Sequence, residues 1–279
     1  MQGSWAVRVE GVSSSRWIDL DGAANVRDLG GLPAADGRQT RPDRLIRADN
    51  LQGLSPSDVR NLVDKHAVRA VVDLRTEVEV ALEGPGPMTH EPEVVVRNFS
   101  LFPESGQNTD VAALDDDAPV VLPWQNRGTD LGESESPNRG ASGVYLRYLD
   151  DRADSVIAAL RLVAQTDGAA IVHCAAGKDR TGVVVALALA EVGVPRAEIV
   201  ADYELSAERI EAIFARLRGS RTYVDDLAGE AIDKHRPRGV TMQRLFDALD
   251  ESAGGAAGWL RAHGWSEQDA ADLREHLLG

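Results

Sequence analysis

One stretch of this chain combines residue types that can do chemistry on an anion: residues 171–182 read IVHCAAGKDRTG. The apolar run before Cys174 predicts a short buried strand, and the apolar stretch after Thr181 predicts a helix. Between them lies the segment from Cys174 to Arg180, which we call the cysteine loop. At such a junction the loop amides and the unpaired N–H groups of the first helical turn converge, which predicts an anion cradle. The same field favours the thiolate form of Cys174, which is the nucleophilic form.

Three further residues of this stretch suit a phosphoryl group. Arg180 follows Cys174 by six positions, and its planar guanidinium can bind two phosphoryl oxygens and follow them into the transition state. Gly177 permits a tight turn with its amides directed inward. Thr181 can donate its hydroxyl hydrogen to the thiolate or to the thiol leaving group. The stretch therefore predicts a thiolate nucleophile at the centre of an anion-binding loop.

The spacing His173-Cys174-x5-Arg180-Thr181 resembles the signature loop of the cysteine-dependent protein tyrosine phosphatases. The full string HCAAGKDRTG is similar to the loop of a narrower set, the bacterial tyrosine/serine and phosphoinositide phosphatases of the mycobacterial PtpB type. Three flanking motifs resemble the same set in the same order, namely Asn25–Gly31 (NVRDLGG), Val72–Arg75 (VDLR) and Asp202–Ser206 (DYELS). The resemblance extends from about residue 17 to residue 210, and so covers most of the chain.

The resemblance implies the chemistry of the site. Cys174 would attack phosphorus and form a phosphocysteine intermediate, which water hydrolyses in a second step. No cofactor and no metal ion is implied. His173 and Thr181 are expected to support the nucleophile, and Lys178 resembles the lysine of loops that accept inositol phosphates. The phosphate-binding residues are expected to be the successive loop positions Ala175, Ala176, Gly177, Lys178, Asp179 and Arg180.

The general acid is the least determined part of the predicted site. The common tyrosine phosphatases carry a Trp-Pro-Asp loop, whereas this chain has only the reversed pair Pro123-Trp124. The resembled bacterial set has an aspartate inside the loop itself, which Asp179 matches, so Asp179 is the preferred acid and base. Asp73 is the second candidate, because a carboxylate at a strand end can approach the cradle or pair with Lys178.

The elements that must position these residues follow from apolar periodicity. Strands are expected at 16–20, 44–48, 69–75, 94–99 and 169–173, and helices at 55–66, 76–82, 143–165 and 181–192. The positions expected to face the core in the third of these helices are Tyr145, Leu149, Ile157, Leu160 and Val163. Helical patterns with breaks near Gly219, Pro237 and Gly254–Gly258 fill the remainder. This alternation predicts an α/β fold, a tyrosine-phosphatase-like central, mostly parallel sheet flanked by helices, with a helical C-terminal region.

One phosphatase domain is expected over residues 1–279, with its core at about 17–210 and a helical C-terminal region at 211–279. Residues 103–142 lack clear periodicity, and so long a segment inside a compact domain is typical of a lid or a flexible insertion. The C-terminal helices are a second candidate for a lid. Arg27 and Asp28 are expected to brace the cysteine loop from beneath, while Asp202 and Tyr203 are expected to belong to the scaffold.

Composition narrows the classes of partner. The 279 residues include 30 Lys and Arg against 45 Asp and Glu, a net charge of −15, which disfavours nucleic acids and anionic membranes. The single cysteine excludes an intramolecular disulfide and a Cys-cluster zinc site. The N-terminus does not resemble a signal peptide and no apolar run is long enough to span a membrane. We expect a cytoplasmic protein without stable membrane insertion, with export by a signal-less route left open.

Two other classes of function share the cysteine loop. A sulfurtransferase or an arsenate reductase also uses a cysteine at the head of an anion loop, although arsenate reduction generally needs further thiols. A phosphate-binding pseudophosphatase is the other alternative, and the presence of both Cys174 and Arg180 argues against it. The expected substrate is a phosphorylated protein or a phosphoinositide. The sequence predicts neither the preferred phospho-residue nor the oligomeric state, and it leaves open whether the basic run at 234–238 is a solvated face or gathers anionic substrate.

Overall fold

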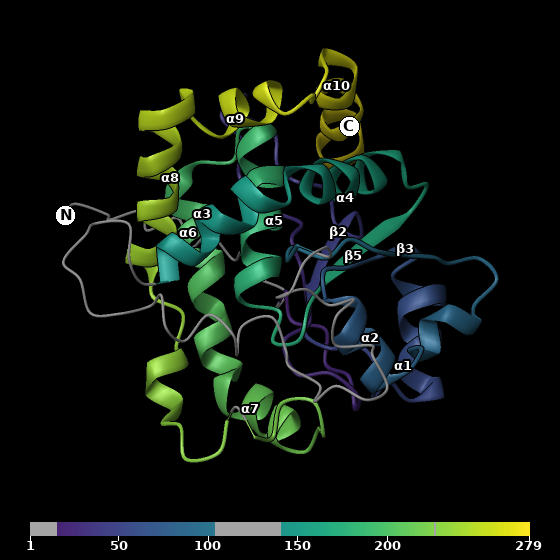
Figure 1. The fold of residues 1–279 in the computed structure, drawn as a ribbon. Helices are drawn as coiled ribbons and strands as arrows, with labels where there is room; N and C mark the ends of the chain where they lie inside the picture. The colour runs from purple at the N-terminus through teal and green to yellow at the C-terminus, as the bar shows by residue number, and fades with distance from the viewer. Residues whose placement is uncertain (1–15, 104–140, 226) are drawn as a thin grey trace, which may run out of the picture.

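The computed structural model describes residues 16–103, 141–225 and 227–279 (Figure 1). Its centre is a sheet with the strand order β1-β2-β5-β3-β4. Strands β2, β5, β3 and β4 run parallel, and β1 pairs antiparallel with β2 at one edge. The strands are β1 (Arg27–Asp28), β2 (Leu45–Ala48), β3 (Val68–Asp73), β4 (Val95–Asn98) and β5 (Ala169–His173). The expected mostly parallel sheet is confirmed.

Helices cover both faces of this sheet (Figure 1). On one face, alternate residues of β3 and β5 share a core with α4 (Ala153–Gln165) and α5 (Asp179–Glu191). On the other face, the intervening residues pack with α1 (Pro56–Arg60) and the π-helical turn η1 (Asn61–Lys65). Because both faces are buried, residues 70–72 of β3 and 169–172 of β5 are continuous apolar runs, without the polar alternation of a half-exposed strand.

Two short elements connect β3 to β4. Helix α2 (Glu77–Glu83) begins with a capping box, in which Thr76 and Glu79 each accept the other's backbone N–H, and it ends at Gly84 with φ +78°. The 3₁₀ turn η2 (Pro87–His90) follows. The helix expected at 76–82 is confirmed, and its capping box fixes the position of Glu79 close to the end of β3.

The strand expected at 16–20 is wrong. Only an isolated bridge forms there, between Trp17 and Arg27. The chain bends away immediately afterwards, because the carboxylate of Asp58 on α1 accepts hydrogen bonds from the backbone N–H groups of Asp21 and Gly22 at 3.0 and 2.9 Å. Ile18 is therefore buried by packing, with little sheet pairing, while Trp17 and Leu20 are half-buried.

The single helix expected at 143–165 is two helices, α3 (Ala141–Asp151) and α4. The break lies at Arg152, whose φ of −136° and ψ of 44° are not helical. Its guanidinium donates to the carbonyl oxygen of Phe102 at 2.7 Å, which ties the break to the chain after β4. The expected inward positions are confirmed, since each of Tyr145, Leu149, Ile157, Leu160 and Val163 is buried.

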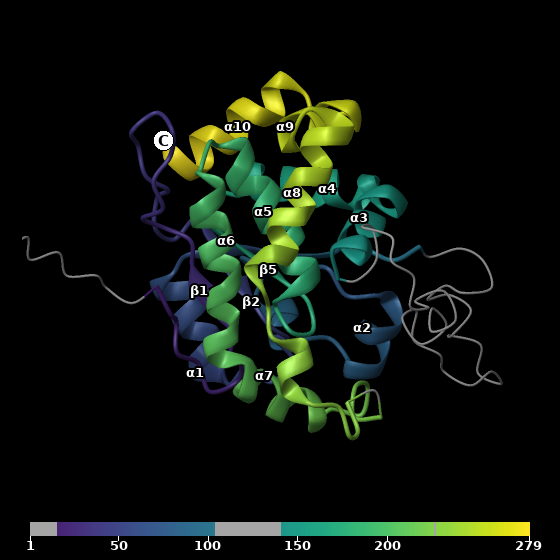
Figure 2. The ribbon, with the colours of Figure 1, turned by 90° about the vertical axis from the view of Figure 1, so that its left-hand side faces the viewer.

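The C-terminal region is helical, as expected. Its helices are α6 (Arg196–Leu205), α7 (Ile210–Arg218), α8 (Gly239–Ala253), α9 (Ala256–Ala262) and α10 (Glu267–Leu278). The breaks at Gly219 and near Pro237 are confirmed, and Gly254 ends α8 with φ +71°. Gly258 lies inside α9, so that part of the expected break is wrong. Helices α8, α9 and α10 share the core of α4 and α5, whereas α7 lies at the opposite end of the molecule (Figure 2).

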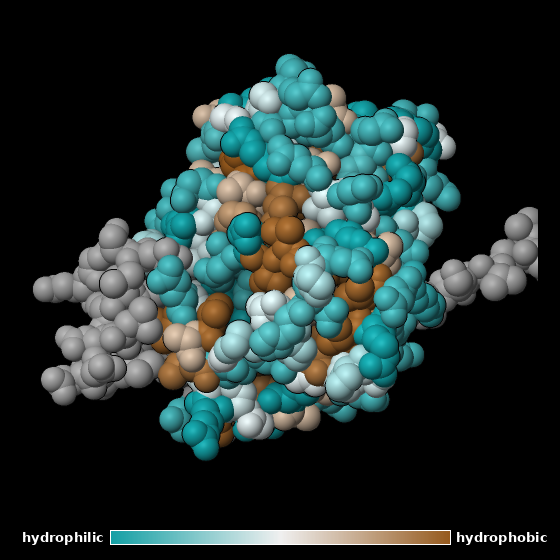
Figure 3. Space-filling view, turned by 90° about the vertical axis from the view of Figure 1, so that its right-hand side faces the viewer, coloured by the Kyte–Doolittle hydropathy of each residue, from teal (hydrophilic) through white to brown (hydrophobic). Residues whose placement is uncertain are grey.

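The edge of the sheet formed by β4 is largely exposed, with Val95 among the exposed apolar side chains. Figure 3 views the molecule from the side opposite to Figure 2. Apolar residues lie in the middle of the surface seen in this view, and hydrophilic residues surround them. The segment expected as a lid or insertion at 103–142, which contains Trp124, lies almost entirely outside the described residues and stays a prediction. Among the helices that the structure describes, none has the length and apolar character needed to cross a bilayer.

Candidate active site

The cysteine loop joins the carboxyl end of β5 to the amino end of α5. Helix α5 begins at Asp179, two residues earlier than expected, and Cys174 is a buried free thiol. Gly177 has φ +65°, and a Cβ at this position would lie 2.4 Å from the carbonyl oxygen of Ala48. A residue with a side chain would therefore be strained and would clash with the backbone of β2. The expected strand–loop–helix junction, with Cys174 at its start, is confirmed.

The carbonyl groups of the loop are held from outside. The backbone N–H of Asn50 donates to the oxygen of Ala175 at 3.0 Å, and the Asn25 amide donates to the oxygens of Ala176 and Gly177 at 3.0 and 3.2 Å. Because each peptide is planar and trans, a carbonyl that points outward leaves the next N–H pointing to the other side. The N–H groups of residues 176–178 consequently face away from these donors, as an anion cradle requires.

A cluster of buried charges lies beneath the loop and positions these donors. Asp202 accepts from Arg27 at 3.1 Å and from Arg47 at 2.7 Å, and Arg16 completes the group at 3.0 Å. Arg47 also donates to the oxygen of Gly177 at 2.8 Å, and Arg27 donates to the Asn25 amide oxygen. Burial would raise the pKa of Asp202, but Arg27 and Arg47 outweigh it and hold that pKa far below its usual range.

The contacts of this cluster confirm the scaffold roles predicted for Arg27 and Asp202. Arg27 braces the cysteine loop, through Asn25, and Asp202 is the scaffold anion that anchors it. The prediction for Asp28 is wrong, because its carboxylate accepts from the N–H groups of Gly30 and Asp43 and so stabilises the turn between β1 and β2.

Arg180 is fixed by the carboxylate of Glu79, a residue that its sequence position does not mark as part of the site. Its Nη1 and Nη2 atoms donate to the two oxygens of Glu79 at 2.5 and 2.8 Å. Tyr223 donates to the same carboxylate at 2.7 Å, and the N–H of Thr76 donates at 2.8 Å. The capping motif Thr76-x-x-Glu79 was a visible signal, but it indicates only a helix start and not that Glu79 is buried against Arg180.

Asp73, the second candidate acid, is enclosed in a different ion pair. Arg75 binds both of its oxygens, at 2.9 and 2.6 Å, and the Nε2 atom of His173 lies 3.6 Å away. Although burial would raise it, His173 and Arg75 lower the pKa of Asp73 to about 2. Burial lowers the pKa of His173 to about 4, so its ring is neutral at pH 7 and carries a charge in the acid range where Asp73 titrates. Pairing with Lys178 was one of the two alternatives for Asp73, and Lys178 pairs with Asp179 instead.

Asp179, the preferred acid, lies at the first turn of α5 with its side chain 35% exposed. The Lys178 ammonium lies 2.7 Å from Oδ1, and the hydroxyl of Tyr145 donates to the same oxygen. Burial would raise the pKa of Asp179, but Lys178 outweighs it and holds that pKa below its usual range. The hydroxyls of Tyr145 and Tyr203 lie 2.8 Å apart, and the ring of Tyr148 stacks on that of Tyr145.

Thr181 lies where a donor to the nucleophile is expected, on the first turn of α5. Its hydroxyl oxygen is buried, and it has no hydrogen-bond partner among residues 16–103, 141–225 and 227–279. An unpaired buried hydroxyl is unfavourable, so an acceptor placed beside it would be stabilised. No group of three or more metal-ligating side chains gathers in the described part of the chain.

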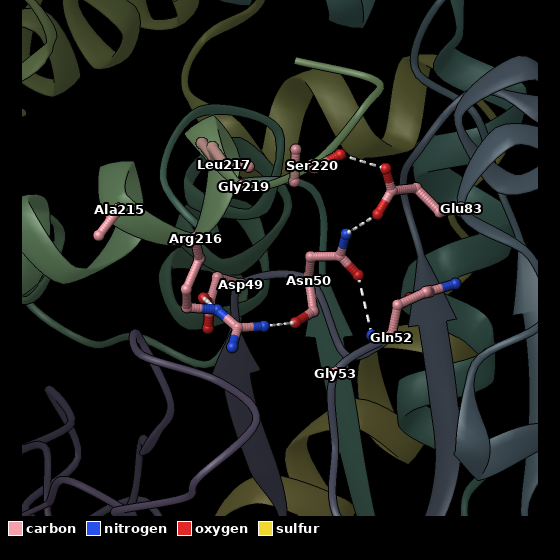
Figure 4. A pocket seen from close by; sticks show the side chains of 11 residues that line it. Asp49, Asn50, Gln52, Gly53, Glu83, Ala215, Arg216, Leu217, Gly219 and Ser220 are labelled. Carbon is pink, nitrogen blue, oxygen red and sulfur yellow. Dashed lines mark hydrogen bonds and ion pairs between the residues drawn. The ribbon is translucent and has the colours of Figure 1, made fainter. Parts of the chain in front are cut away.

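An apolar cluster covers the cysteine loop from the side of α7. Ala175 packs there with the apolar residues Ile210, Ile213, Phe214, Leu217, Tyr223 and Leu227. Beside this cluster is a pocket of about 370 Å³ between residues 49–53 and α7, with Ala175 in its wall (Figure 4). Its wall combines ion-paired and apolar groups: Arg216 pairs with Asp49 at 3.3 Å and the Asn50 amide donates to Glu83 at 3.1 Å, while Leu217 adds apolar surface.

Comparison with known proteins decides the family. The sequence model that describes the tyrosine phosphatase family matches residues 18–279 of this chain. The chain belongs to the tyrosine phosphatase family. A similar curated protein is the triple specificity protein phosphatase PtpB of Mycobacterium tuberculosis, 31% identical over 94% of this chain and 99% of that protein. A tyrosine-protein phosphatase of Nostoc commune is 29% identical over 88% of this chain and 78% of its own length.

Membership in this family confirms the expected resemblance and the cysteine-based phosphatase activity. The chain is a protein-tyrosine phosphatase, and its single cysteine, Cys174, lies in the loop that resembles the family's signature. The match begins at residue 18 and reaches the C-terminus, so it includes the helices after α6. The substrate of this phosphatase is consequently a phosphorylated molecule.

Proposed function

We propose that this chain hydrolyses phosphomonoesters, phosphotyrosine foremost, through a phosphocysteine intermediate on Cys174. The observation that carries the proposal is the cradle: Cys174 lies at its start, its carbonyls are held outward, and Arg180 is fixed at its end by Glu79. A phosphoryl group bound there would meet the loop N–H groups and the α5 terminus on one side. The Arg180 guanidinium would stabilise its charge in the transition state.

In the first step the Cys174 sulfur attacks phosphorus while the bond from phosphorus to the leaving oxygen breaks. The leaving oxygen takes a proton from Asp179, and the phosphoryl group stays bound to sulfur. In the second step water attacks phosphorus and gives a proton to the Asp179 carboxylate. The phosphorus–sulfur bond breaks, inorganic phosphate leaves, and the Cys174 thiolate is restored with Thr181 as a hydrogen-bond donor.

Asp179 suits the acid and base role better than Asp73. Both oxygens of Asp73 already accept from Arg75, and its side chain is only 7% exposed, so a proton would have to displace an ion pair. Asp179 is partly exposed and its principal cationic partner is Lys178. A dianionic phosphoryl group in the cradle would share Lys178 and repel the carboxylate, which raises the pKa of Asp179 toward the protonated form.

The proposed substrates are phosphotyrosine and phosphoserine or phosphothreonine in proteins, and phosphoinositides. The name of the PtpB relative, a triple specificity phosphatase, supports such a range. The segment from α7 to the 3₁₀ turn η6 (Ile232–His235) covers the loop, so we propose that it moves when substrate enters.

The chain is proposed to act as one domain, since α8 to α10 share a core with α4 and α5. A cytoplasmic location belongs to the same proposal, because a reducing compartment keeps the thiol of Cys174 unoxidised. Signal-less export is compatible with it.

The decisive experiment measures hydrolysis of p-nitrophenyl phosphate by the reduced protein in the presence of EDTA. We expect turnover in the wild type and none in Cys174→Ser, whose hydroxyl is a far weaker nucleophile. Rapid acid quench with a ³²P-labelled phosphopeptide should trap a labelled phosphocysteine in the wild type only. Turnover by Cys174→Ser would refute the mechanism, and persulfide formation from thiosulfate without phosphatase turnover would favour the sulfurtransferase alternative.

A further inference from the structure

We propose that Tyr145 and Tyr203 are positioning residues for Asp179, and that they reserve Oδ2 of Asp179 as the atom that gives and takes the proton. The inference rests on the proposed acid and base role of Asp179. It assigns a function to two hydroxyls that the sequence suggested were packing and scaffold.

The hydrogen bonds run in one direction. An ionised carboxylate can only accept, so Tyr145 must give its single hydroxyl hydrogen to Oδ1 of Asp179. The contact of 2.8 Å between the two phenolic oxygens then needs Tyr203 as its donor. The result is a chain in which Tyr203 donates to Tyr145 and Tyr145 donates to Asp179. Donation from Tyr203 strengthens the Tyr145 hydroxyl as a donor, because successive hydrogen bonds polarise one another.

Three separate segments of the chain meet at this point. Tyr145 comes from α3, Tyr203 from α6 and Asp179 from α5, and both tyrosine rings are buried. The rings meet edge to face with 6.4 Å between centroids. A Cβ on Gly182, one turn after Asp179, would lie 3.1 Å from the ring of Tyr203. The absence of a side chain at residue 182 is therefore what lets the Tyr203 ring approach α5.

The two oxygens of Asp179 differ as a consequence. Oδ1 receives both the Lys178 ammonium at 2.7 Å and the Tyr145 hydroxyl. Within the described ranges, no donor contacts Oδ2, and the side chain is 35% exposed. A proton that added to Oδ1 would have to displace a donor, whereas a proton on Oδ2 displaces none. Oδ2 is accordingly the atom from which a leaving group can be protonated and to which water can give a proton.

Tyr145 can keep this role at every pH at which Asp179 titrates. Burial and the nearby Asp179 carboxylate raise the pKa of Tyr145 well above its usual value, so it stays a neutral donor. Burial likewise raises the pKa of Tyr203. Other charged or titratable groups also act on the Asp179 carboxylate, from α5 and from η6; these are Lys178, Arg180 and His235. Among all of them, the Tyr145 hydroxyl is the neutral donor in direct contact with the carboxylate.

The test is the pH dependence of kcat for a phosphotyrosine peptide in Tyr145→Phe and Tyr203→Phe. The Tyr145 donor stabilises the ionised carboxylate, so its removal raises the pKa of Asp179 and the acid form persists to higher pH. We expect the alkaline limb of the profile to move up by about one pH unit in Tyr145→Phe. A smaller shift in the same direction is expected in Tyr203→Phe. Ser252→Ala is the control, because it removes an exposed hydroxyl that donates to the Ala248 carbonyl on α8, and its alkaline limb should stay in place.

A second readout reports on orientation. The p-nitrophenolate leaving group departs without protonation, whereas the alkoxide of phosphoserine does not. Tyr145→Phe should therefore lower kcat for a phosphoserine peptide about tenfold more than kcat for p-nitrophenyl phosphate. Circular dichroism confirms that each variant is folded, and Tyr203→Phe carries the test if Tyr145→Phe is not.

The outcomes separate this inference from the function on which it rests. If the alkaline limb of both tyrosine variants coincides with that of the wild type, while Asp179→Asn loses it, the positioning role is wrong. If Asp179→Asn itself retains the wild-type limb, the acid and base assignment fails and the inference fails with it. The loss of turnover in Cys174→Ser tests the phosphocysteine mechanism independently of both.

Discussion

Replacing Glu79 by glutamine exchanges one carboxylate oxygen for an NH₂ group and leaves the volume of the side chain nearly unchanged. Each oxygen of Glu79 accepts one Arg180 N–H and one further donor, from Tyr223 or from Thr76. Whichever oxygen is replaced, the new NH₂ group faces two donors, and one of them belongs to Arg180. The buried guanidinium then keeps only one of its two hydrogen bonds to residue 79.

The expected loss of activity in Glu79→Gln follows from the one hydrogen bond to Arg180 that this substitution removes. A hydrogen bond to a charged group contributes about 1.5–3 kcal/mol, and about 1.4 kcal/mol corresponds to a factor of ten in rate. We therefore expect kcat/KM of Glu79→Gln to fall by about 10- to 150-fold. Unpairing one partner of a buried ion pair also destabilises the fold, by up to about 3–5 kcal/mol.

The assay combines kcat/KM for p-nitrophenyl phosphate, the inhibition constant of inorganic phosphate, and urea unfolding at one pH. Inhibition by phosphate should weaken together with catalysis, because both need Arg180 in place. Glu77→Gln is the matched control, since Glu77 lies on the same helix but is exposed. A folded Glu79→Gln protein with kcat/KM within twofold of the wild type would refute the reasoning that Glu79 fixes Arg180.

Two further predictions concern the loop and the ion pair behind it. Gly177→Ala should lower activity at least tenfold and also lower Tm. The reason is that residue 177 has φ +65° and that a Cβ there would lie 2.4 Å from the Ala48 carbonyl oxygen. Unchanged Tm and activity would show that the turn can relax. Asp73 has its pKa lowered to about 2 in the fold, so the stability that it contributes is complete above its unfolded value of about 4 and is lost as the pH falls toward 2. Urea unfolding across pH 2–7 should thus show a larger free energy of unfolding for the wild type than for Asp73→Asn at neutral pH. This difference in free energy should vanish near pH 2. A difference that is independent of pH would contradict the ion pair.

The sequence predicted best what depends on local pattern. The apolar run of β5, the loop length from Cys174 to Arg180 and the need for glycine at 177 are all readable in one short stretch, and the structure has them there. The breaks at Gly219 and Gly254 follow from residue type in the same way. In each of these cases the physical cause lies within a few residues of its effect.

The sequence predicted poorly what depends on which polar groups meet. Glu79 and Arg180 are 101 positions apart, and only the packing of α2 against the cysteine loop brings them together. The same holds for Tyr145 and Asp179, which come from different helices. Arg27 and Asp28 are adjacent in the sequence, yet adjacent residues of a strand point to opposite faces, so Arg27 reaches the scaffold of the loop while Asp28 accepts from the N–H of Gly30.

All four tyrosines of the chain surround the charged groups of the cysteine loop. Their hydroxyls and rings meet Asp179, Glu79 or one another, at positions Tyr145, Tyr148, Tyr203 and Tyr223. Protein grown with 3-fluorotyrosine would therefore give a ¹⁹F NMR spectrum in which every resonance comes from the active site. Binding of phosphate or vanadate, opening of the α7 segment and titration of Asp179 could each be followed at separate signals, with no background from the rest of the molecule.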